Sequence, residues 1–311
     1  MISRKIPVYL GRCPIYERAG IRADIEDMAG CLHLAQSYAG QTVLLKPNLI
    51  SATAPALACT HAEFVAAVAA AFLDRGARVR VGDSPAFGTA LRAMDRHGIT
   101  RALAGMDAEV IEFTTPVEQT LSCGLPLTIA GESLECDLLV NLPKIKAHNQ
   151  MYVTSSVKNI FGIVLGMRKA LLHMTQGESH QRFAGIILDL LEILPAHVAI
   201  ADGIDVMHRE GPISGERLSL GLVAGSADPV AVDTALLGLL GLDHRKSPLW
   251  QTAAERNLPG SWTDNLDYPA LHPGAFAGSG FIAPGVLDSV RFTPVRFLRG
   301  LLRRFLLAMR R

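Results

Sequence analysis

The sequence predicts an α/β fold in which largely parallel or mixed sheets are flanked by helices, arranged as two α/β lobes with the site between them. The 311-residue chain is 49 % hydrophobic, which is enough apolar material for a large core. Aromatic residues make up only 6 %, while small aliphatic residues are abundant, as in buried sheets covered by helices. A strand, a helix and a second strand follow one another between residues 42 and 83.

The first strand is expected at residues 42–45 (TVLL), and Pro47 prevents it from continuing as a central strand. Thr60 is expected to cap the following helix, with Glu63 as the fourth residue of a capping box. Residues 79–83 (VRVGD) are typical of a second strand. This order predicts a right-handed parallel crossover.

Polar residues stand where these two strands end. Lys46 and Asn48 follow the first strand, and Asp83 ends the second. Ligands of open parallel sheets gather beyond the carboxyl ends of the strands. These three residues are therefore candidates for a binding site.

Further elements complete an α/β domain over residues 1–260. A buried amphipathic helix is expected at residues 183–194. Asp228 is a preferred helix cap and Pro229 suits the first helical position, so another helix opens there. Asp233 lies on that apolar helix and needs a partner. Further strands are expected at residues 109–113, 125–129, 137–141, 198–202 and 218–224.

The C-terminal part divides into an irregular Gly/Pro-rich wrap over residues 261–290 and a basic amphipathic helix over residues 291–311. This helix could lie on an anionic membrane surface, or it could pack on its own domain with its arginines in solvent. The sequence shows neither a secretory signal nor an apolar run long enough to cross a bilayer. A cytoplasmic location is expected, with the inner face of the membrane as a place of peripheral contact.

Charge argues against a nucleic-acid partner. The net charge is +1, but residues 291–311 hold seven arginines and no acid, which leaves 23 basic against 29 acidic residues in the body. A nucleic-acid footprint needs a basic body. The five cysteines are odd in number and form no CxxC pair, which fits reduced thiols.

A cluster of cations and histidines follows the strand at 137–141. Lys144, Lys146 and His148 alternate in NLPKIKAHN, so an extended backbone would project all three to one side. Several cations beyond the end of one strand could hold a carboxylate or a phosphate. The alternative is that the lysines are solvated surface residues. Downstream, the same cluster is expected to include Lys158, Asn159, Lys169 and His173.

Two other readings of these residues stay open. His148 and His173 could ligate a metal together with Asp83, Asp202 or Asp233, although neither an HExxH motif nor dense His/Cys spacing is present. Asp202 could point into the same crevice as Asp83, or its Asp-Gly pair could simply form a turn. Residues 210–215 could close over a ligand or form a hairpin loop.

Nucleotide signatures are missing. The segment 162–166 (GIVLG) is too short between its glycines for a phosphate loop, and no GxGxxG motif suggests a nicotinamide site. Ferredoxin spacing is absent, so Cys13, Cys31 and Cys59 could meet only through folding.

Taken in order, LLKPNL, VGDSP, LVNLPKIKAH, SVKNIFG, IADGIDVMHREGPISG and GSADPVAVDTALLGLLGL closely resemble the domain of unknown function 362 family, over roughly residues 40–245. The resemblance implies an association with iron–sulfur proteins and an electron-transfer partner, although this chain has no CxxCxxC run. A more distant similarity is to the nickel-pincer lactate racemase group. It implies cofactor or proton-transfer roles for Lys144, Lys146, Lys158, His148 or His173.

The leading hypothesis is an enzyme that acts on a small anionic metabolite, a carboxylate or a phosphate. A redox or iron–sulfur accessory protein and a non-catalytic metabolite-binding protein are the alternatives. The cofactor is left open between an iron–sulfur cluster and a divalent metal. The expected catalytic residues are His148, His173, Lys146 and Lys158, and the expected substrate-binding residues are Lys46, Asn48, Lys144, Asn159, Lys169, Asp83 and Asp202.

Overall fold

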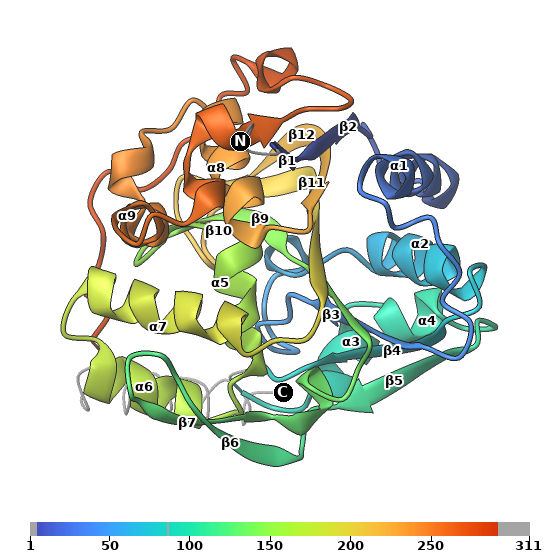
Figure 1. Ribbon diagram of the computed structural model, residues 1–311, viewed down its shortest axis with the longest axis horizontal. Coiled ribbons are helices and arrows are strands. Elements are labelled where there is room, and N and C mark those ends of the chain that lie inside the picture. Colours follow the sequence, from blue (N-terminus) through green and yellow to red (C-terminus); the bar gives the residue numbers. More distant parts are fainter. Residues whose placement is uncertain (1–4, 86, 292–311) are drawn as a thin grey trace.

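The structure is a computed structural model that describes residues 5–85 and 87–291. Within this part, nine strands form one sheet in the order β10-β9-β11-β8-β3-β4-β5, with β12 paired to β11 and β2 paired to β12 (Figure 1). The strands are β2 (Tyr9–Arg12), β3 (Thr42–Pro47), β4 (Arg78–Asp83), β5 (Ala108–Glu112), β8 (Leu138–Leu142), β9 (Lys144–His148), β10 (Tyr152–Thr154), β11 (His197–His208) and β12 (Glu216–Ser226).

The sheet is mixed. Strand β3 pairs in parallel with β4 and β8, β4 with β5, and β11 with β8 and β9. Strands β10, β12 and β2 run antiparallel to their partners. The predicted α/β class with mixed sheets is confirmed, and β3 and β4 have the expected parallel crossover.

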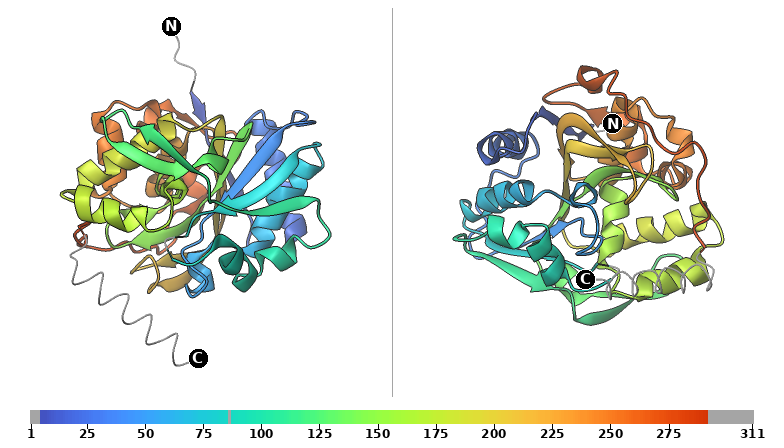
Figure 2. Two further views of the ribbon diagram at one scale, coloured as in Figure 1. Left: turned by 90° about the horizontal axis from the view of Figure 1, so that it is seen from below. Right: turned by 180° about the vertical axis from the view of Figure 1, so that it is seen from behind.

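Helices cover both faces of the sheet (Figures 1 and 2). On one face lie α1 (Arg18–Cys31), α2 (Ala62–Leu73), α3 (Ala90–Arg96) and α4 (Ile99–Ala102). The other side carries α5 (Ser156–Ile160), α6 (Arg168–Gln176), α7 (His180–Glu192), α8 (Pro229–Leu239) and α9 (Pro248–Glu255). Alternation along β3 serves both layers, because Val43 and Leu45 pack with α1 and α2 whereas Leu44 packs with α5 and α7.

Smaller elements complete the chain. Strand β1 (Ile6–Pro7) pairs with β13 (Leu266–Asp267) of the wrap, and β6 (Pro116–Thr120) forms a hairpin with β7 (Pro126–Ala130). The single-turn helices are η1 (Ala56–Ala58), η2 (Gly131–Ser133), η3 (Phe161–Ile163), η4 (His244–Lys246), η5 (Pro259–Ser261), η6 (Thr263–Asn265) and η7 (Pro273–Phe276).

The predicted cap of α2 is wrong by one residue. His61 caps the helix, and its Nδ1 accepts from the Glu63 amide at 3.2 Å. Thr60 has another task, because its hydroxyl accepts from the Asn48 amide at 2.8 Å and donates to the Leu142 carbonyl at 2.7 Å. Thr60 therefore ties the segment before α2 to the ends of β3 and β8.

The caps of the later helices agree better with the sequence. Asp228 caps α8 as predicted, through bonds of 2.8 and 3.1 Å from the amides of Val230 and Ala231, and Pro229 is the first helical residue. The turn that the sequence left open as one alternative at Asp202 does not form. Strand β11 runs on to His208, with an irregularity between Gly203 and Asp205.

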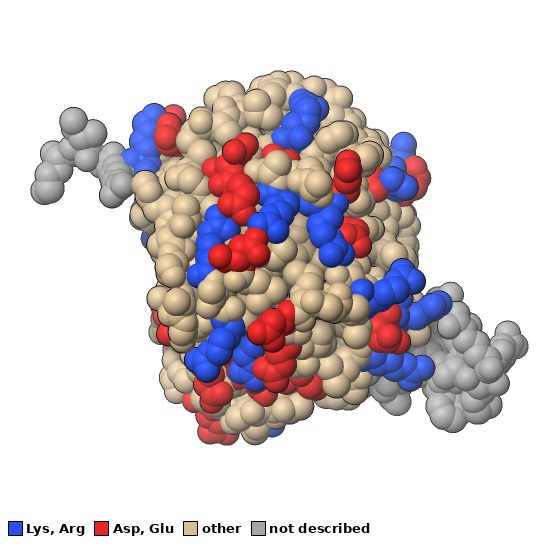
Figure 3. All heavy atoms as spheres, turned by 90° about the vertical axis from the view of Figure 1, so that its right-hand side faces the viewer, with Lys and Arg blue, Asp and Glu red and all other residues tan. Residues whose placement is uncertain are grey.

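The face formed mainly by α1–α4 carries Lys and Arg interspersed with Asp and Glu (Figure 3). Arg75, just after α2, pairs with Glu26 of α1 at 2.6 Å, and Arg80 of β4 pairs with Glu109 of β5 at 3.0 Å. Among the helices at residues 5–85 and 87–291, none has both the length and the apolar character needed to cross a bilayer. The helix predicted at 291–311 lies outside the described residues except for Arg291.

Candidate functional site

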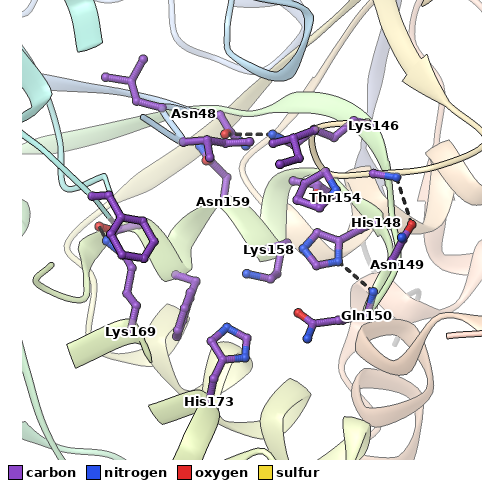
Figure 4. Close-up of a pocket in the computed structure, with 18 of the residues that line it drawn as sticks. Asn48, Lys146, His148, Asn149, Gln150, Thr154, Lys158, Asn159, Lys169 and His173 are labelled. Atoms are coloured by element: carbon purple, nitrogen blue, oxygen red, sulfur yellow. Dashed lines mark hydrogen bonds between the residues drawn. The ribbon is translucent and has the colours of Figure 1, made fainter. Parts of the chain in front are cut away.

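A cavity of about 480 Å³ opens at the carboxyl ends of β3 and β4, between α5, α6 and the β11–β12 loop (Figure 4). Polar and charged side chains from segments far apart in the sequence line it. They are Asn48, Asp83, Ser84, Lys146, His148, Asn149, Gln150, Thr154, Lys158, Asn159, Lys169, His173, Ser214 and Asp288. Eight of the eleven predicted site residues are in this set.

Behind the cavity wall, β3 and β4 bring a buried ion pair together. The Lys46 ammonium lies 2.9 Å from Asp83 Oδ1, and both side chains are at most 3 % exposed. Asp83 Oδ2 also accepts from the Leu49 amide at 3.0 Å. Asp83 faces the cavity, whereas Lys46 does not line it. Lys46 therefore neutralises the Asp83 carboxylate from behind the cavity wall.

Gly162, in the middle of η3, leaves room for this pair. A β-carbon there would lie 2.2 Å from Lys46 Nζ and 2.6 Å from Asp83 Oδ1. Any side chain would therefore push the buried pair apart. The lack of space beside the ion pair explains why SVKNIFG ends in glycine, and no phosphate loop is needed to account for it.

Strand β9 contributes Lys146 and His148, which project to the same side as predicted. Lys146 Nζ donates to Asn48 Oδ1 at 3.1 Å and also to the Ala58 carbonyl. Burial is the main cause that lowers the pKa of Lys146 to about 8. This amine is therefore close to its titration midpoint at physiological pH.

His148 is held as a neutral hydrogen-bond donor. Its Nδ1 accepts from the amides of Gln150 and Met151 at 3.1 and 3.2 Å, so the ring proton of the neutral form is assigned to Nε2. Burial first, and then the charges of Lys158 and Lys146, hold the pKa of His148 well below its usual range. The neutral ring can donate a hydrogen bond through Nε2. Its one ring lone pair, on Nδ1, already accepts from the two amides and is not available to take up a proton.

Helix α5 positions Lys158 and Asn159, and Asp233 is the reason why it begins there. The Asp233 carboxylate accepts from the amides of Ser156 and Val157 at 2.7 and 3.2 Å. Asp233 thus has the partner that the sequence required, at a helix start that lacks a side-chain cap from Ser155. Burial raises the pKa of Asp233 to about 7.

Lys158 reaches into the middle of the cavity (Figure 4). Its ammonium lies 4.4 Å from the centroid of the Phe161 ring and, among the described residues, makes no hydrogen bond or ion pair. Burial, followed by the charges of Lys146 and Lys46, lowers the pKa of Lys158 to about 7. Next to it, Asn159 donates to Asn141 Oδ1 at 2.8 Å and anchors α5 to β8.

Helix α6 supplies Lys169 and His173. The Lys169 amine donates to the carbonyls of Ser84 and Gly162, the latter at 3.1 Å, and burial lowers its pKa to about 7. His173 Nδ1 donates to the Val290 carbonyl at 3.1 Å, which leaves the Nε2 lone pair as the acceptor of the neutral ring. Burial and the charge of Lys158 lower the pKa of His173 to about 4. The two histidines therefore adopt opposite tautomers.

The β11–β12 loop forms another wall of the cavity and is also the hairpin loop that the sequence offered as the alternative. Gly211 donates to Asn149 Oδ1 at 3.0 Å, and the Asn149 amide donates to the Gly211 carbonyl at 3.2 Å. A β-carbon on Gly211 would lie 1.8 Å from the Ala147 carbonyl oxygen. This close approach holds the loop against the end of β9.

Lys144 and Asp202 lie away from the cavity lining, in a buried ion pair of 2.9 Å. Asp202 also accepts from Tyr16 Oη at 2.7 Å and from the His61 amide at 3.0 Å, and the Tyr16 and His61 rings stack with centroids 3.7 Å apart. Two residues along a strand move a side chain by roughly 6.6 Å, which separates Lys144 from Lys146. Sequence reasoning missed Tyr16, because no local pattern links it to a partner 186 positions away.

Residues 5–85 and 87–291 contain no group of three or more His, Cys, Asp or Glu side chains arranged to hold a metal ion. The cysteines considered for a cluster have separate environments, since Cys13 donates to the Ile15 carbonyl at 3.3 Å and Cys59 lies 3.5 Å from His97 Nε2. The described residues thus do not offer the donor set of an iron–sulfur cluster.

Comparison with known proteins gives one family and a few relatives. A family model described as a domain of unknown function (DUF362) matches residues 43–238. A thylakoid-associated protein of Synechocystis sp. is 33 % identical over 289 residues, which cover 92 % of this chain and 89 % of that protein.

Two solved structures are similar at a lower level. The lactate racemase apoprotein from Thermoanaerobacterium thermosaccharolyticum aligns over 74 % of this chain with a TM-score of 0.45 and 15 % identity. A protein from Thermotoga maritima aligns over 67 % with a TM-score of 0.43 and 12 % identity. The aligned parts span 56 % and 55 % of those two chains.

Proposed function

We propose that this chain, which belongs to the DUF362 family, is an enzyme that binds a small anionic metabolite, a carboxylate or a phosphate, in the lysine-lined cavity. The observation that carries the proposal is the Lys158 amine, which stands in the cavity without a hydrogen bond or ion pair to any described residue. A bound anion would supply the missing partner and stabilise the ammonium form.

The charges of the lining favour an anion. Lys146, Lys158 and Lys169 face the cavity, and of the two lining carboxylates Asp83 is already paired with Lys46. Three amines from β9, α5 and α6 can thus approach one carboxylate or phosphate from different sides. Such a group accepts several charge-assisted hydrogen bonds at once.

The histidines would then divide the proton chemistry between them. His148 would donate a hydrogen bond through Nε2 to a polarised oxygen of the substrate, as a neutral imidazole can. Nε2 of His173 has the lone pair that accepting a proton requires. We assign supporting roles to Lys46, Lys144 and Asp202, because their ion pairs lie outside the cavity lining.

Thermal unfolding in the presence of sulfate, phosphate and small carboxylates tests the anion site. Stabilisation should follow the anion concentration and should largely disappear in Lys158→Met, which keeps the packing on Phe161 but has no charge. Lys246→Met removes an exposed lysine and is the matched control. Equal stabilisation of the parent and both variants would place the anion elsewhere.

Turnover separates an enzyme from a binding protein. Exchange of carbon-bound hydrogen with deuterated water, followed by proton NMR on small carboxylates and phosphate esters, should be lost in His173→Gln while anion stabilisation persists. Anion binding without exchange or conversion of any compound would favour the non-catalytic metabolite-binding alternative. An electron-transfer partner stays a prediction.

We also propose a cytoplasmic protein with peripheral membrane contact through residues 291–311. Apolar residues and arginines alternate there in the sequence, and the relative from Synechocystis is named as thylakoid-associated. The full chain should sediment with vesicles that contain anionic phospholipid, and a chain that ends at Arg291 should not. The truncation keeps Val290, whose carbonyl accepts from His173. Equal sedimentation of both chains would contradict a role for this segment.

A further inference from the structure

We propose that Lys158 is a nucleophile that forms an imine with a substrate carrying a carbonyl group next to an anionic group, as in a 2-oxo acid or a phosphorylated ketone. This inference rests on the proposed function: a simple anion pairs with the Lys158 ammonium, whereas the anionic group of a carbonyl substrate is held by Lys146 and Lys169 and its carbonyl group meets the neutral Lys158 amine. It adds the substrate class and a covalent step to the anion site.

Hydrogen bonding singles out Lys158 among the three cavity lysines. Lys146 donates to Asn48 Oδ1 and the Ala58 carbonyl, and Lys169 donates to two further carbonyls. Such acceptors stabilise the ammonium form, which has no lone pair for attack. Lys158 has no such acceptor among the described residues, so its nitrogen is the one whose lone pair no protein acceptor keeps protonated or turned away from a ligand.

The surroundings of Lys158 also favour the neutral amine. Burial first, and then the charges of Lys146 and Lys46, lower the pKa of Lys158, and they outweigh the stabilisation that the face of the Phe161 ring gives to the ammonium form. A desolvated lysine beside other cations is the arrangement that makes an amine nucleophilic near neutral pH. A pKa of about 7 gives Lys158 a substantial neutral fraction near neutral pH.

The geometry also provides for the substrate. Lys146 and Lys169 come from β9 and α6, on either side of Lys158, and can hold the anionic group. His148 lines the same cavity and offers Nε2–H to the carbonyl oxygen. The Lys158 side chain extends into the cavity beside His148 (Figure 4). We therefore expect a carbonyl carbon held by these contacts to come within reach of the Lys158 nitrogen.

The chemical step balances without a cofactor. The Lys158 nitrogen attacks the carbonyl carbon, a C–N bond forms as the C=O π bond breaks, and the oxygen takes up a proton to give a carbinolamine. Loss of the hydroxyl group as water, with a further proton transfer, leaves a protonated imine. The net reaction takes up one proton from solvent and releases one water molecule.

Reductive trapping of the full-length protein tests the proposal. The protein is incubated with pyruvate or dihydroxyacetone phosphate and sodium cyanoborohydride, and the adduct is located by peptide mass spectrometry. We expect one stable adduct at Lys158, which forms faster as the pH rises through about 7 and more slowly when phosphate is added. Acetone, which lacks the anionic group, should label the site far less.

The variants keep the test decisive. Lys158→Arg and Lys158→Met should both lose the adduct while their circular dichroism matches the parent, and Lys246→Met should keep it. Label that spreads over exposed lysines, or appears first on Lys146 or Lys169, would overturn the assignment. If anions stabilise the protein but no adduct forms, this inference fails and the proposed anion site stands. If neither occurs, both fail.

Discussion

Gly162 shows how much of the site depends on the absence of one methyl group. Its Cα lies against a fully buried lysine–aspartate pair, so a β-carbon would meet both charged atoms within 2.6 Å. A buried ion pair tolerates displacement poorly, because each charge then loses the partner that compensates its desolvation. The glycine is required by space and not by backbone conformation.

Gly162→Ala should therefore destabilise the fold by about 1–3 kcal/mol, the usual cost of overpacking a core. It should also weaken anion binding, because Lys169 donates to the Gly162 carbonyl. Urea unfolding and anion-dependent thermal shifts measure the two effects.

Gly30→Ala is the control, since nothing lies within 4 Å of the added atom on α1. That change should be neutral, or stabilising by up to about 1 kcal/mol, as expected for alanine in a helix. A Gly162→Ala protein as stable as Gly30→Ala would show that the buried pair can move aside.

At the residue scale, the sequence predicted most of the cavity lysines and histidines, because alternation in NLPKIKAH and proximity in sequence already group them. It could not separate Lys144 from Lys146. Their difference comes from the partners that each meets, Tyr16 and Asp202 for Lys144, and Asn48 and Ala58 for Lys146. Nor did alternation reveal the opposite tautomers of the histidines, which depend on backbone groups of residues 150, 151 and 290.

Among the elements, α5 is the one on which the site depends most directly. It is five residues long, too short to be stable alone, and it carries both Lys158 and Asn159. Asp233 of α8 accepts from its first two amides, and Asn159 anchors it to β8. A buried carboxylate on one helix therefore fixes the position of an amine on another.

Asp233→Ala should release these two amides and cost about 1–3 kcal/mol, the penalty for buried groups left without partners. Anion binding should weaken as Lys158 loses its fixed position, and Asp233→Asn, with one remaining acceptor oxygen, should lose less. Denaturant unfolding and anion titration measure both.

The neighbouring Thr234 provides the control, because its buried hydroxyl has no hydrogen-bond partner in the described part of the chain. Thr234→Val keeps the shape of the side chain, so it should leave anion binding unchanged and should leave stability unchanged or raise it slightly, because the buried hydroxyl makes no hydrogen bond. Equal losses in Thr234→Val and Asp233→Ala would mean that packing, not capping, is what matters at this end of α8.

Sequence patterns predicted a helix best where one local pattern was enough to locate it. Asp228–Pro229 marked the start of α8, and the apolar periodicity marked α7. Thr60 was misassigned because a capping box and a tertiary hydrogen bond use the same hydroxyl, and the bond to Leu142 can be recognised only after folding.

For the whole molecule, the three cavity amines make stability depend on pH in an unusual direction. The pKa values of Lys146, Lys158 and Lys169 are lowered to about 8, 7 and 7 in the folded chain. Between these values and the unfolded pKa of about 10.4, the unfolded chain binds more protons, so stability rises with pH. Below about pH 7 both states are protonated and this contribution is constant.

Urea unfolding from about pH 7 to about pH 8, below the pKa of about 8.5 of unfolded cysteines, should therefore show stability increasing. Saturating phosphate should flatten the increase, because the anion stabilises the ammonium forms. Lys158→Met should reduce the slope, and Lys246→Met should leave it unchanged. A parent protein that loses stability over this range would show that the amines are not desolvated.

The overall architecture was partly predictable. Composition and the strand–helix–strand order gave the α/β class, but the branching of the sheet at β11, which pairs with β8, β9 and β12, leaves no local signature. The predicted strands at 109–113, 137–141, 198–202 and 218–224 correspond to strands of one sheet with β3 and β4, whereas that at 125–129 corresponds to a strand of the small hairpin. Which sheet a strand joins is decided by long-range pairing and not by the β-propensity of its residues.

The hydrogen bonds between Asn149 and Gly211 have a kinetic consequence. They pin the β11–β12 loop to the end of β9, and the close packing of Gly211 on Ala147 leaves the loop little room to shift. A ligand then enters an aperture that is already formed and does not wait for a gate to open. Stopped-flow traces of anion binding should be single exponentials whose observed rate grows linearly with anion concentration, without the plateau that a slow opening step imposes.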